Sequence, residues 1–390
     1  MQRGMYVVLS CAVAAVLACQ VCAASTVHGA SSKQGPRGDS GLRAAEDAFV
    51  QVDQGFKRIE DLGIERVVFA TRLSYDDPHW YANIGYYCDD RDKKAYAGNG
   101  KPDQSKLYLL DVRSREVRVL FDAEGGGVRD PAVHYDGRTV LFAYRRGGCD
   151  WYNLYEIQAD GSGLRQVTRG PWDDYEAAYL PDGDIVFVST RSQRWVGCWK
   201  TQVGTLFRCN RRGGDIRPIS YNLEHDNTPA VLPDGRIVFT RWEYVDRSQV
   251  GYHQLWTMSP DGANVATYFG NQQHYPLFID AKPIPGTEEL LLIDSPGHGR
   301  SDHRGFVCTI AAKYGPDDER GYHRITPRPT FNDPAPIDSD NFVVASGKRI
   351  LIGNRSGDLA PVVTYKGEAN VHEPVLLRER PRERILAEQT

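Results

Sequence analysis

Polar residues that could do chemistry recur through the chain, each at the start of a short apolar segment. Carboxylates gathered in one place can accept backbone N–H groups, bind a cation, or act as general acids and bases. Which chemistry is open to them depends on whether the fold brings them together. They stand at intervals of about 50 residues, a spacing typical of repeat architectures: Asp130, Glu176, Thr228, Asp280 and Asp333.

The segments around these residues repeat as well. "DPAVHYDGRTVLFAYR" (130–145), "EAAYLPDGDIVFVSTR" (176–191) and "HDNTPAVLPDGRIVFTRW" (225–242) each contain a polar opening, an apolar strand, an Asp-Gly pair and a second apolar strand. Asp-Gly between apolar runs is a strong hairpin signal, because glycine takes a positive φ without steric cost. A third strand repeats at 107–110, 154–157 and 255–258. Four antiparallel strands in each repeat predict the blades of a β-propeller.

Six such blades account for residues 64–380. The first unit has a second strand at 67–69 but no first strand, whereas "EPVLL" (373–377) copies an opening strand with nothing after it. We therefore predict an all-β fold, a six-bladed β-propeller closed by pairing of its N- and C-terminal strands. We expect residues 381–390 to form a tail that leads into a further C-terminal domain.

Propeller geometry decides where the polar openings gather. The start of strand one and the loop after strand two share one face of the disk, which we call the loop face. Two interpretations of the openings stay open: they accept backbone N–H groups beside a water-filled channel, or they bind a cation or substrate. The candidates for a ligand site at the channel mouth are Asp130, Glu176, His225, Asp226, Asp280 and Asp333.

The loops of the same face carry the remaining candidate residues. His225 and Asp226 belong to the densest polar cluster, "EHDN" (224–227), and are candidate metal ligands. That segment has no second histidine at ligand spacing, so the pattern of a zinc site is incomplete. The aromatic and polar loop residues either cover the disk or contact a partner. The partner-face candidates are Trp80, Trp195, Trp199, Trp242, Glu243 and His298.

Residues 1–24 have the pattern of a secretory signal, with Arg3, an apolar run over 5–18 and small residues near a cleavage site. We predict a periplasmic or secreted protein, with lipid anchoring at Cys19 as the alternative. Apolar residues between 42 and 62 recur at helical spacing, so residues 25–63 are predicted to be a linker and one amphipathic helix. No other apolar run could span a bilayer. A net charge of -4 with scattered Lys and Arg argues against nucleic-acid binding.

These repeats support a family resemblance. Phrases of the type "LPDGRIVF…LWTMSPDG" resemble TolB-type, WD-like propellers. "GGVRDPAVHYDGRTVLFAYR", "TPAVLPDGRIVFTRWEYVDRS", "DAKPIPGT" and "SPGHGR" together resemble the propeller region of hydrazine synthase alpha-subunit-like proteins, over about residues 64–380. In that family the propeller is followed by domains that carry c-type haem. The resemblance implies an exported propeller, and it does not carry hydrazine chemistry over to this chain.

Cysteine usage separates this chain from those haem domains. It contains no Cys-x-x-Cys-His, so we predict no haem and no redox chemistry in this chain, and a metal cation is the remaining cofactor candidate. Cys209 and Cys308 are predicted core residues. Cys88, Cys149 and Cys198 lie in loops of one face, where a disulfide and a metal site both stay open.

Two functions follow from the sequence. The first is an exported scaffold, without catalytic activity of its own, that docks a haem domain or a partner protein on the loop face. The alternative is a small-molecule or cation-binding lyase or hydrolase site at the channel mouth. A purified protein with stoichiometric metal would favour the second.

Overall fold

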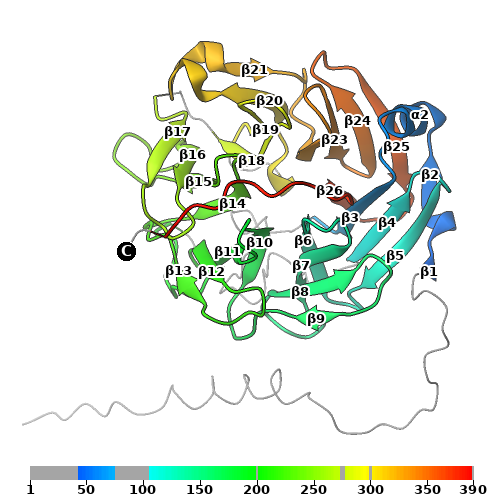
Figure 1. The fold of residues 1–390 in the computed structure, drawn as a ribbon, viewed down its shortest axis with the longest axis horizontal. Helices are drawn as coiled ribbons and strands as arrows, with labels where there is room; N and C mark the ends of the chain where they lie inside the picture. Colours follow the sequence, from blue (N-terminus) through cyan, green and yellow to red (C-terminus); the bar gives the residue numbers. More distant parts are fainter. Residues whose placement is uncertain (1–42, 75–104, 199–200, 273–276, 298–300, 389–390) are drawn as a thin grey trace, which may run out of the picture. The chain divides into compact units, whose positions relative to one another are not determined.

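The computed structural model describes residues 43–74, 105–198, 201–272, 277–297 and 301–388. Within these residues six antiparallel sheets are arranged around one axis (Figure 1). In four of the sheets, strands that follow one another in the sequence pair as a meander whose first strand is the innermost, and the other two sheets also take up a strand from the opposite end of the chain. The structure therefore confirms the predicted six-bladed β-propeller.

The strands group into blades as follows. Blade 2 contains β6 (Gly127–Val133), β7 (Thr139–Arg145), β8 (Asn153–Gln158) and β9 (Arg165–Gln166). Blade 3 contains β10 (Asp174–Tyr179), β11 (Ile185–Ser189), β12 (Thr205–Cys209) and β13 (Arg217–Pro218). Blade 4 contains β14 (Asp226–Val231), β15 (Ile237–Trp242), β16 (His253–Met258) and β17 (Ala266–Phe269).

The remaining blades include the two ends of the propeller. Blade 5 contains β18 (Phe278–Pro283), β19 (Glu289–Asp294), β20 (Phe306–Ala311) and β21 (Tyr322–Arg324), with short 3-10 helices η5 (Ser301–His303), η6 (Ala312–Tyr314) and η7 (Glu319–Gly321). Blade 6 contains β22 (Asn332–Pro336), β23 (Asn341–Ser346), β24 (Arg349–Asn354), β25 (Leu359–Tyr365) and β2 (Phe49–Gln51). Blade 1 contains β26 (Asn370–Leu376), β3 (Arg66–Arg72), β4 (Lys106–Asp111), β5 (Glu116–Asp122) and β1 (Arg43–Ala44).

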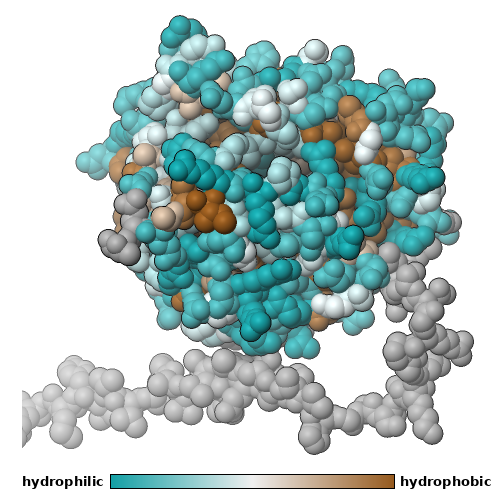
Figure 2. Space-filling view, viewed as in Figure 1, coloured by the Kyte–Doolittle hydropathy of each residue, from teal (hydrophilic) through white to brown (hydrophobic). Residues whose placement is uncertain are grey.

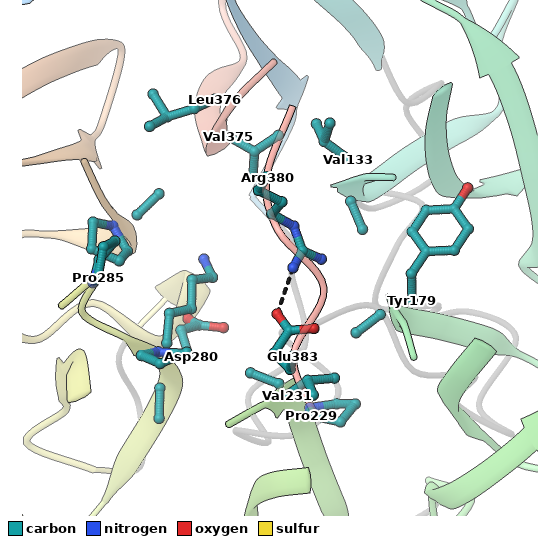
Figure 3. A pocket seen from close by; sticks show the side chains of 18 of the residues that line it. Val133, Tyr179, Pro229, Val231, Asp280, Pro285, Val375, Leu376, Arg380 and Glu383 are labelled. Atoms are coloured by element: carbon teal, nitrogen blue, oxygen red, sulfur yellow. Dashed lines mark hydrogen bonds and ion pairs between the residues drawn. The ribbon is translucent and has the colours of Figure 1, made fainter. Parts of the chain in front are cut away.

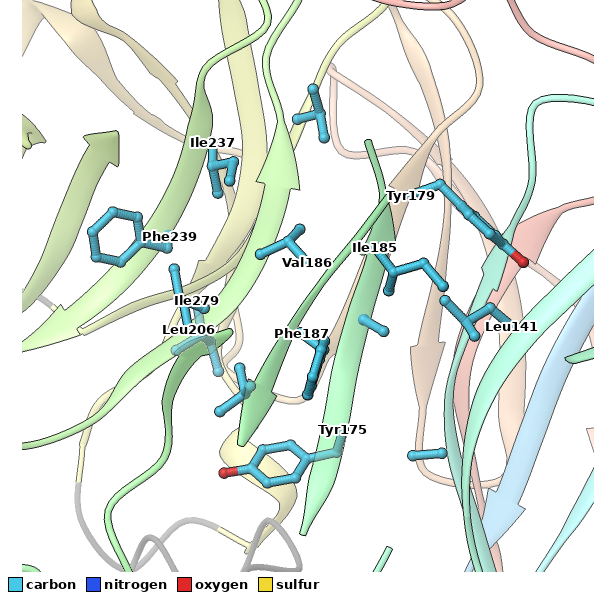
Figure 4. Packing of buried hydrophobic residues seen from close by; sticks show 14 of the residues in the cluster. Leu141, Tyr175, Tyr179, Ile185, Val186, Phe187, Leu206, Ile237, Phe239 and Ile279 are labelled. Atoms are coloured by element: carbon cyan, nitrogen blue, oxygen red, sulfur yellow. The ribbon is translucent and has the colours of Figure 1, made fainter. Parts of the chain in front are cut away.

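The second strand of each blade carries the core. All five residues of β11 are buried, as are six of the seven in β7. These strands are continuous apolar runs because neighbouring blades cover both of their faces. Figure 4 shows the result between blades 2, 3 and 4, where Leu141, Phe187 and Ile237 belong to one buried cluster.

The ring closes where the sequence predicted. Strand β26 pairs antiparallel with β3, with Val375 opposite Val68 and Leu376 opposite Val67. A strand from the C-terminal end therefore supplies the innermost strand of blade 1.

The segment before the propeller contains the expected helix, but the helix is shorter than the helical spacing over 42–62 suggests. The helix α2 spans only Asp53–Asp61 and buries Phe56 and Ile59. Before it, β1 and β2 pair with the outer strands β5 and β25, and η1 (Glu46–Ala48) lies between them. Open sheet edges offer unpaired backbone groups, so strand pairing overrides the helical spacing of the side chains. No helix in the described ranges is long and apolar enough to cross a membrane.

Candidate functional site

Strand one of every blade presents one residue toward the propeller axis. Each stands at a β-bulge, where the register with strand two shifts. The six residues have φ between 46° and 56°, the left-handed region that residues other than glycine seldom adopt. We call them the axial ring: Asp130, Glu176, Thr228, Asp280, Asp333 and Glu373.

Hydrogen bonds join the axial ring from blade to blade. The backbone N–H of Glu176 donates to Asp130 Oδ2 at 3.0 Å, and that of Thr228 donates to Glu176 Oε2 at 2.7 Å. The same link joins Asp280 to Thr228 Oγ1 (3.3 Å), Glu373 to Asp333 Oδ2 (2.9 Å) and Asp130 to Glu373 Oε2 (2.9 Å). These acceptors satisfy backbone groups that the bulges would otherwise leave unpaired.

Basic side chains offset part of the ring's negative charge. Arg129 Nε donates to Asp130 Oδ2 at 2.6 Å, and its Nη2 lies 3.4 Å from Glu176. Arg72 pairs with Glu373 at 2.5 Å. Both arginine side chains are less than a tenth exposed, so these charge-assisted bonds lie away from bulk water.

Burial and neighbouring carboxylates raise the pKa values of three ring carboxyls, whereas basic neighbours lower the pKa of Asp333. Burial, with Asp130 nearby, raises the pKa of Glu176 to about 8, and burial raises that of Glu373 to about 8 despite Arg72. Burial and the Asp333 carboxylate raise the pKa of Asp280 to about 7. Burial also acts on Asp333, but the hydrogen bond from His372 and the charge of Arg72 hold its pKa well below the usual range. The ring therefore carries fewer charges near neutral pH than its carboxyl count suggests.

A cavity of about 770 Å³ lies against the ring. It is lined by ring residues and by the second halves of the first strands, so it opens toward the Asp-Gly turns. The sequence predicts a ligand site on the opposite, loop face, and that site stays a prediction. Apolar side chains such as Val133, Val231 and Val375 form the walls of the cavity (Figure 3).

The C-terminal tail, residues 377–388, crosses this cavity (Figures 1 and 3). Arg380 and Arg382 lie over the ring of Tyr135, at 3.9 and 4.6 Å from its centroid. The Tyr135 hydroxyl donates to Glu383, which pairs with Arg380 at 2.5 Å. The turn glycines explain the close fit, because a Cβ on Gly137 would lie 2.3 Å from the backbone N of Glu379. The face of the propeller seen in Figure 2 is largely hydrophilic, apart from a few apolar patches.

The loop-face candidates His225 and Asp226 have structural partners. His225 is fully buried, its Nδ1 accepts the N–H of Gly204 at 2.9 Å, and its ring stacks on Trp242. Both oxygens of Asp226 accept from Arg241, at 2.8 and 2.9 Å. Neither residue belongs to the axial ring, so the structure separates them from the other four ligand candidates. Their role as metal ligands stays a prediction.

The partner-face candidates also divide. Trp195 is 46% exposed, whereas Trp242 is completely buried and cannot reach a partner without repacking. Glu243 pairs with Arg247 at 2.7 Å on the same side. Trp80, Trp199 and His298 lie outside the described residues, as do Cys88, Cys19 and the predicted signal.

The cysteines on the strands lie as expected. Cys209 and Cys308 are fully buried in the core. Cys149 and Cys198 lie in loops that follow second strands, and the disulfide and the metal site both stay predictions.

Several site residues were missed by sequence reasoning. Glu373 was recognised as an opening but not as a site residue, and the ring partners Arg72, Arg129 and His372 were not considered. His372 and Arg129 immediately precede ring residues, but the residue type at that position varies between the repeats, so the repeat pattern does not single them out. Arg72 comes from strand two, and only the closure of blade 1 brings it to Glu373.

Comparison with known proteins agrees with this architecture. The "Hydrazine synthase subunit alpha" of Kuenenia stuttgartiensis is 25% identical over 313 residues, covering 64% of this chain and 37% of that protein. The structure of "Kuenenia stuttgartiensis Hydrazine Synthase" superposes with a TM-score of 0.67 at 18% identity, over 83% of this chain and 48% of that one. This chain resembles the propeller region of the hydrazine synthase alpha subunit.

Other propellers share the fold alone. TolB from Acinetobacter baumannii gives a TM-score of 0.55 at 12% identity, over 82% of this chain and 69% of that chain. No family model matches the sequence. The chain spans about two fifths of the length of the hydrazine synthase subunit that it matches, so the whole subunit's activity is not transferred by the likeness.

Proposed function

We propose that this protein is an exported propeller platform that docks a haem-carrying domain or subunit on its loop face, in an assembly of the hydrazine synthase kind. The likeness to that enzyme's alpha subunit supports the setting, because more than half of the subunit's length lies outside the match. The absence of a haem-attachment motif supports a non-catalytic role for this chain.

The observation that carries the proposal is a group of exposed apolar side chains on the loop face. Tyr221 is 76% exposed and Leu223 65%, both between β13 and β14. Trp195 follows β11, and Val245 and Val250 follow β15, each more than two fifths exposed. Large apolar side chains gathered on a soluble surface mark interaction sites. We call these five residues the docking patch.

Hydrogen bonds hold the three loops of the docking patch together. Arg194 Nη2 donates to the carbonyl of Asn222 at 2.6 Å, which joins the first loop to the second. Asn222 Nδ2 donates to the carbonyl of Trp242 at 2.9 Å, which joins the second to the third. A surface fixed in this way loses little conformational entropy when a partner binds.

The test is haem capture from an extract of the source organism. Tagged protein should retain c-type haem, measured by pyridine haemochromogen absorbance. A variant with Trp195→Ser, Tyr221→Ser and Leu223→Ser should retain at least tenfold less, because central aromatic and apolar anchors dominate binding energy. A control with Val265→Ser and Ile385→Ser changes exposed apolar residues elsewhere and should behave as wild type. Equal capture by the patch variant, or no haem with any variant, would contradict the proposal.

The cavity favours a second candidate, the small-molecule or cation-binding site of a lyase or hydrolase. Five of the six residues of the axial ring line the cavity, and perturbed carboxyl pKa values in a cleft are typical of functional sites. If this candidate is correct, ligand or metal uptake by the purified protein should depend on Glu176 and Asp280.

A further inference from the structure

His372 stands between two carboxylates near the loop-face side of the ring. Its Nδ1 lies 3.3 Å from Asp333 Oδ2, and its Nε2 lies 4.0 Å from Asp302 Oδ2. The side chains of His372 and Asp302 are each 1% exposed. Three blades supply these groups, since Asp302 follows β19 of blade 5, Asp333 lies in β22 of blade 6 and His372 lies in β26 of blade 1.

Neighbouring side chains fix the Asp302 carboxylate toward His372. Its Oδ2 accepts from Ser74 Oγ at 2.8 Å and from Asn370 Nδ2 at 3.5 Å. Asn370 Nδ2 also donates to Ser74 Oγ at 2.9 Å, and Asn332 Nδ2 donates to the backbone carbonyl of Asp302. Blade 1 thus positions the carboxylate of Asp302, and blade 6 holds its backbone.

Two polar atoms inside this arrangement have no hydrogen-bond partner among the described residues: His372 Nε2 and Asp302 Oδ1. Buried polar atoms are nearly always satisfied, by protein, water or an ion, because leaving one unpaired costs about 1–3 kcal/mol. A histidine that binds a metal commonly directs its other ring nitrogen to a carboxylate, which fixes the ring's orientation. Asp333 stands in that position relative to His372.

We infer that His372 Nε2 and the Asp302 carboxylate ligate a divalent transition-metal ion, with Asp333 orienting the imidazole. Glu373 also brings a carboxylate oxygen close, since one ligand atom each of Asp333, His372 and Glu373 lies within 4.8 Å of the others. Arg72 pairs with Glu373, however, and offsets its charge. The two remaining carboxylates match a dication.

The donor set selects the class of metal. Imidazole nitrogen with carboxylate oxygen suits Zn²⁺ and other first-row ions, whereas Mg²⁺ and Ca²⁺ prefer oxygen ligands throughout. Arg304 lies 3.6 Å from Asp302 Oδ2 on the outer side, with its side chain 35% exposed. Its positive charge opposes the metal, so Arg304→Gln should tighten binding by about two- to fivefold.

A second histidine in the same propeller provides a matched control. His134 is also buried, and its Nδ1 lies 2.9 Å from Asp136 Oδ2. Its Nε2 likewise has no hydrogen-bond partner among the described residues. No second carboxylate is paired with His134 in the described part of the chain. We therefore expect that His134 and Asp136 alone do not bind a divalent metal ion.

The experiment is calorimetric titration of the chelator-treated full chain with Zn²⁺, and separately with Mn²⁺ and Ca²⁺. Zn²⁺ should bind one to one. Asp302→Asn and His372→Gln should each weaken Zn²⁺ binding at least tenfold, and Asp333→Asn by about 10- to 100-fold as an orienting residue. His134→Gln should leave it unchanged. Electron spin-echo spectra of bound Mn²⁺ should show an imidazole nitrogen in wild type that His372→Gln removes.

Each outcome decides the inference. If His372→Gln does not fold by circular dichroism, Asp302→Asn and Arg304→Gln give the answer instead. Absence of one-to-one Zn²⁺ binding, wild-type affinity in Asp302→Asn, or equally tight Ca²⁺ binding would overturn the site. Metal lost only in Glu176→Gln and Asp280→Asn would also overturn it and place the ion in the cavity.

Discussion

At the scale of the residue, all six members of the axial ring have a strained backbone, and five of them accept a hydrogen bond from the next blade. A non-glycine residue in the left-handed region costs about 1–2 kcal/mol. The side chain aimed inward by that conformation accepts a buried N–H, as Asp130 does from Glu176 at 3.0 Å. Polar residues recur at these positions because an apolar side chain could not accept that bond.

The raised pKa of Glu176 makes stability depend on pH. Its pKa is about 8 when folded, against an ordinary value near 4.5. Between these values the folded chain holds a proton that the unfolded chain has lost. This contribution to stability is therefore complete below about pH 4.5 and is lost as the pH rises through 8. We expect Glu176→Gln to be more stable than wild type at pH 8.5, by on the order of 1 kcal/mol or more.

The measurement is urea unfolding of both proteins at pH 5.5 and 8.5. The advantage of Glu176→Gln should shrink at the lower pH, where wild-type Glu176 keeps its proton. Glu60→Gln, on an exposed position of α2, is the control and should shift stability equally at the two pH values. An advantage for Glu176→Gln that is independent of pH would show that Glu176 is ionised in the folded protein across this range.

The repeats were enough to find the ring positions but not the partners of the ring. Asp130, Glu176, Asp280 and Asp333 could be predicted, because one residue of each repeat performs the same task. Arg129 and His372 could not, since their roles depend on which neighbouring carboxylate each one reaches. That choice is made by packing between blades, and each blade packs differently.

At the scale of the element, the position of the tail, residues 377–388, could not be predicted from any sequence periodicity. The tail has no regular secondary structure, yet Arg380, Arg382 and Glu383 all contact Tyr135. Cation–π contacts contribute about 0.5–2 kcal/mol each, depending on their exposure. A single aromatic residue on the β6–β7 connection thus holds a segment that is distant in sequence.

We predict that Tyr135→Ala releases the tail. The change removes both cation–π contacts and the bond to Glu383, and it should lower stability by about 3 kcal/mol or more. Hydrogen exchange at residues 378–387 should rise by at least tenfold. Tyr135→Phe keeps the ring and loses only its hydroxyl bonds, so it should cost about 1 kcal/mol and leave the tail largely protected. A tail that stays protected in Tyr135→Ala would show that its other contacts suffice.

The segment before the propeller illustrates the limit of periodicity. Phe56 and Ile59 follow the helical spacing of the apolar residues between 42 and 62, and both lie on the buried face of α2. Phe49 has the same helical spacing but lies in β2, opposite Tyr365. The free edge of β25 forms backbone hydrogen bonds with this segment. The spacing of apolar residues in the sequence does not show that such an edge lies nearby.

At the scale of the whole molecule, the closure of the ring could be predicted from two incomplete repeats. The last repeat consists of a first strand alone, and the first repeat lacks its first strand. Each therefore supplies what the other lacks, and β26 pairs with β3. The side on which the cavity opens could not be predicted. It depends on the position of the β-bulge within strand one of each blade and on the path of the tail. The repeat pattern predicts neither of these.

Closure should dominate the stability of the propeller, and two deletions separate it from the tail. Removing residues 378–390 takes the cover from the cavity but leaves β26 in place, so we expect a loss of about 1–3 kcal/mol. Removing residues 370–390 also takes β26, exposes the edge of β3 and deletes Glu373 from the ring. That loss should exceed about 5 kcal/mol and lower the unfolding temperature by more than 10 °C beyond the shorter deletion. Thermal unfolding followed by circular dichroism checks both, and equal unfolding temperatures for the two variants would mean that β26 does not lock the ring.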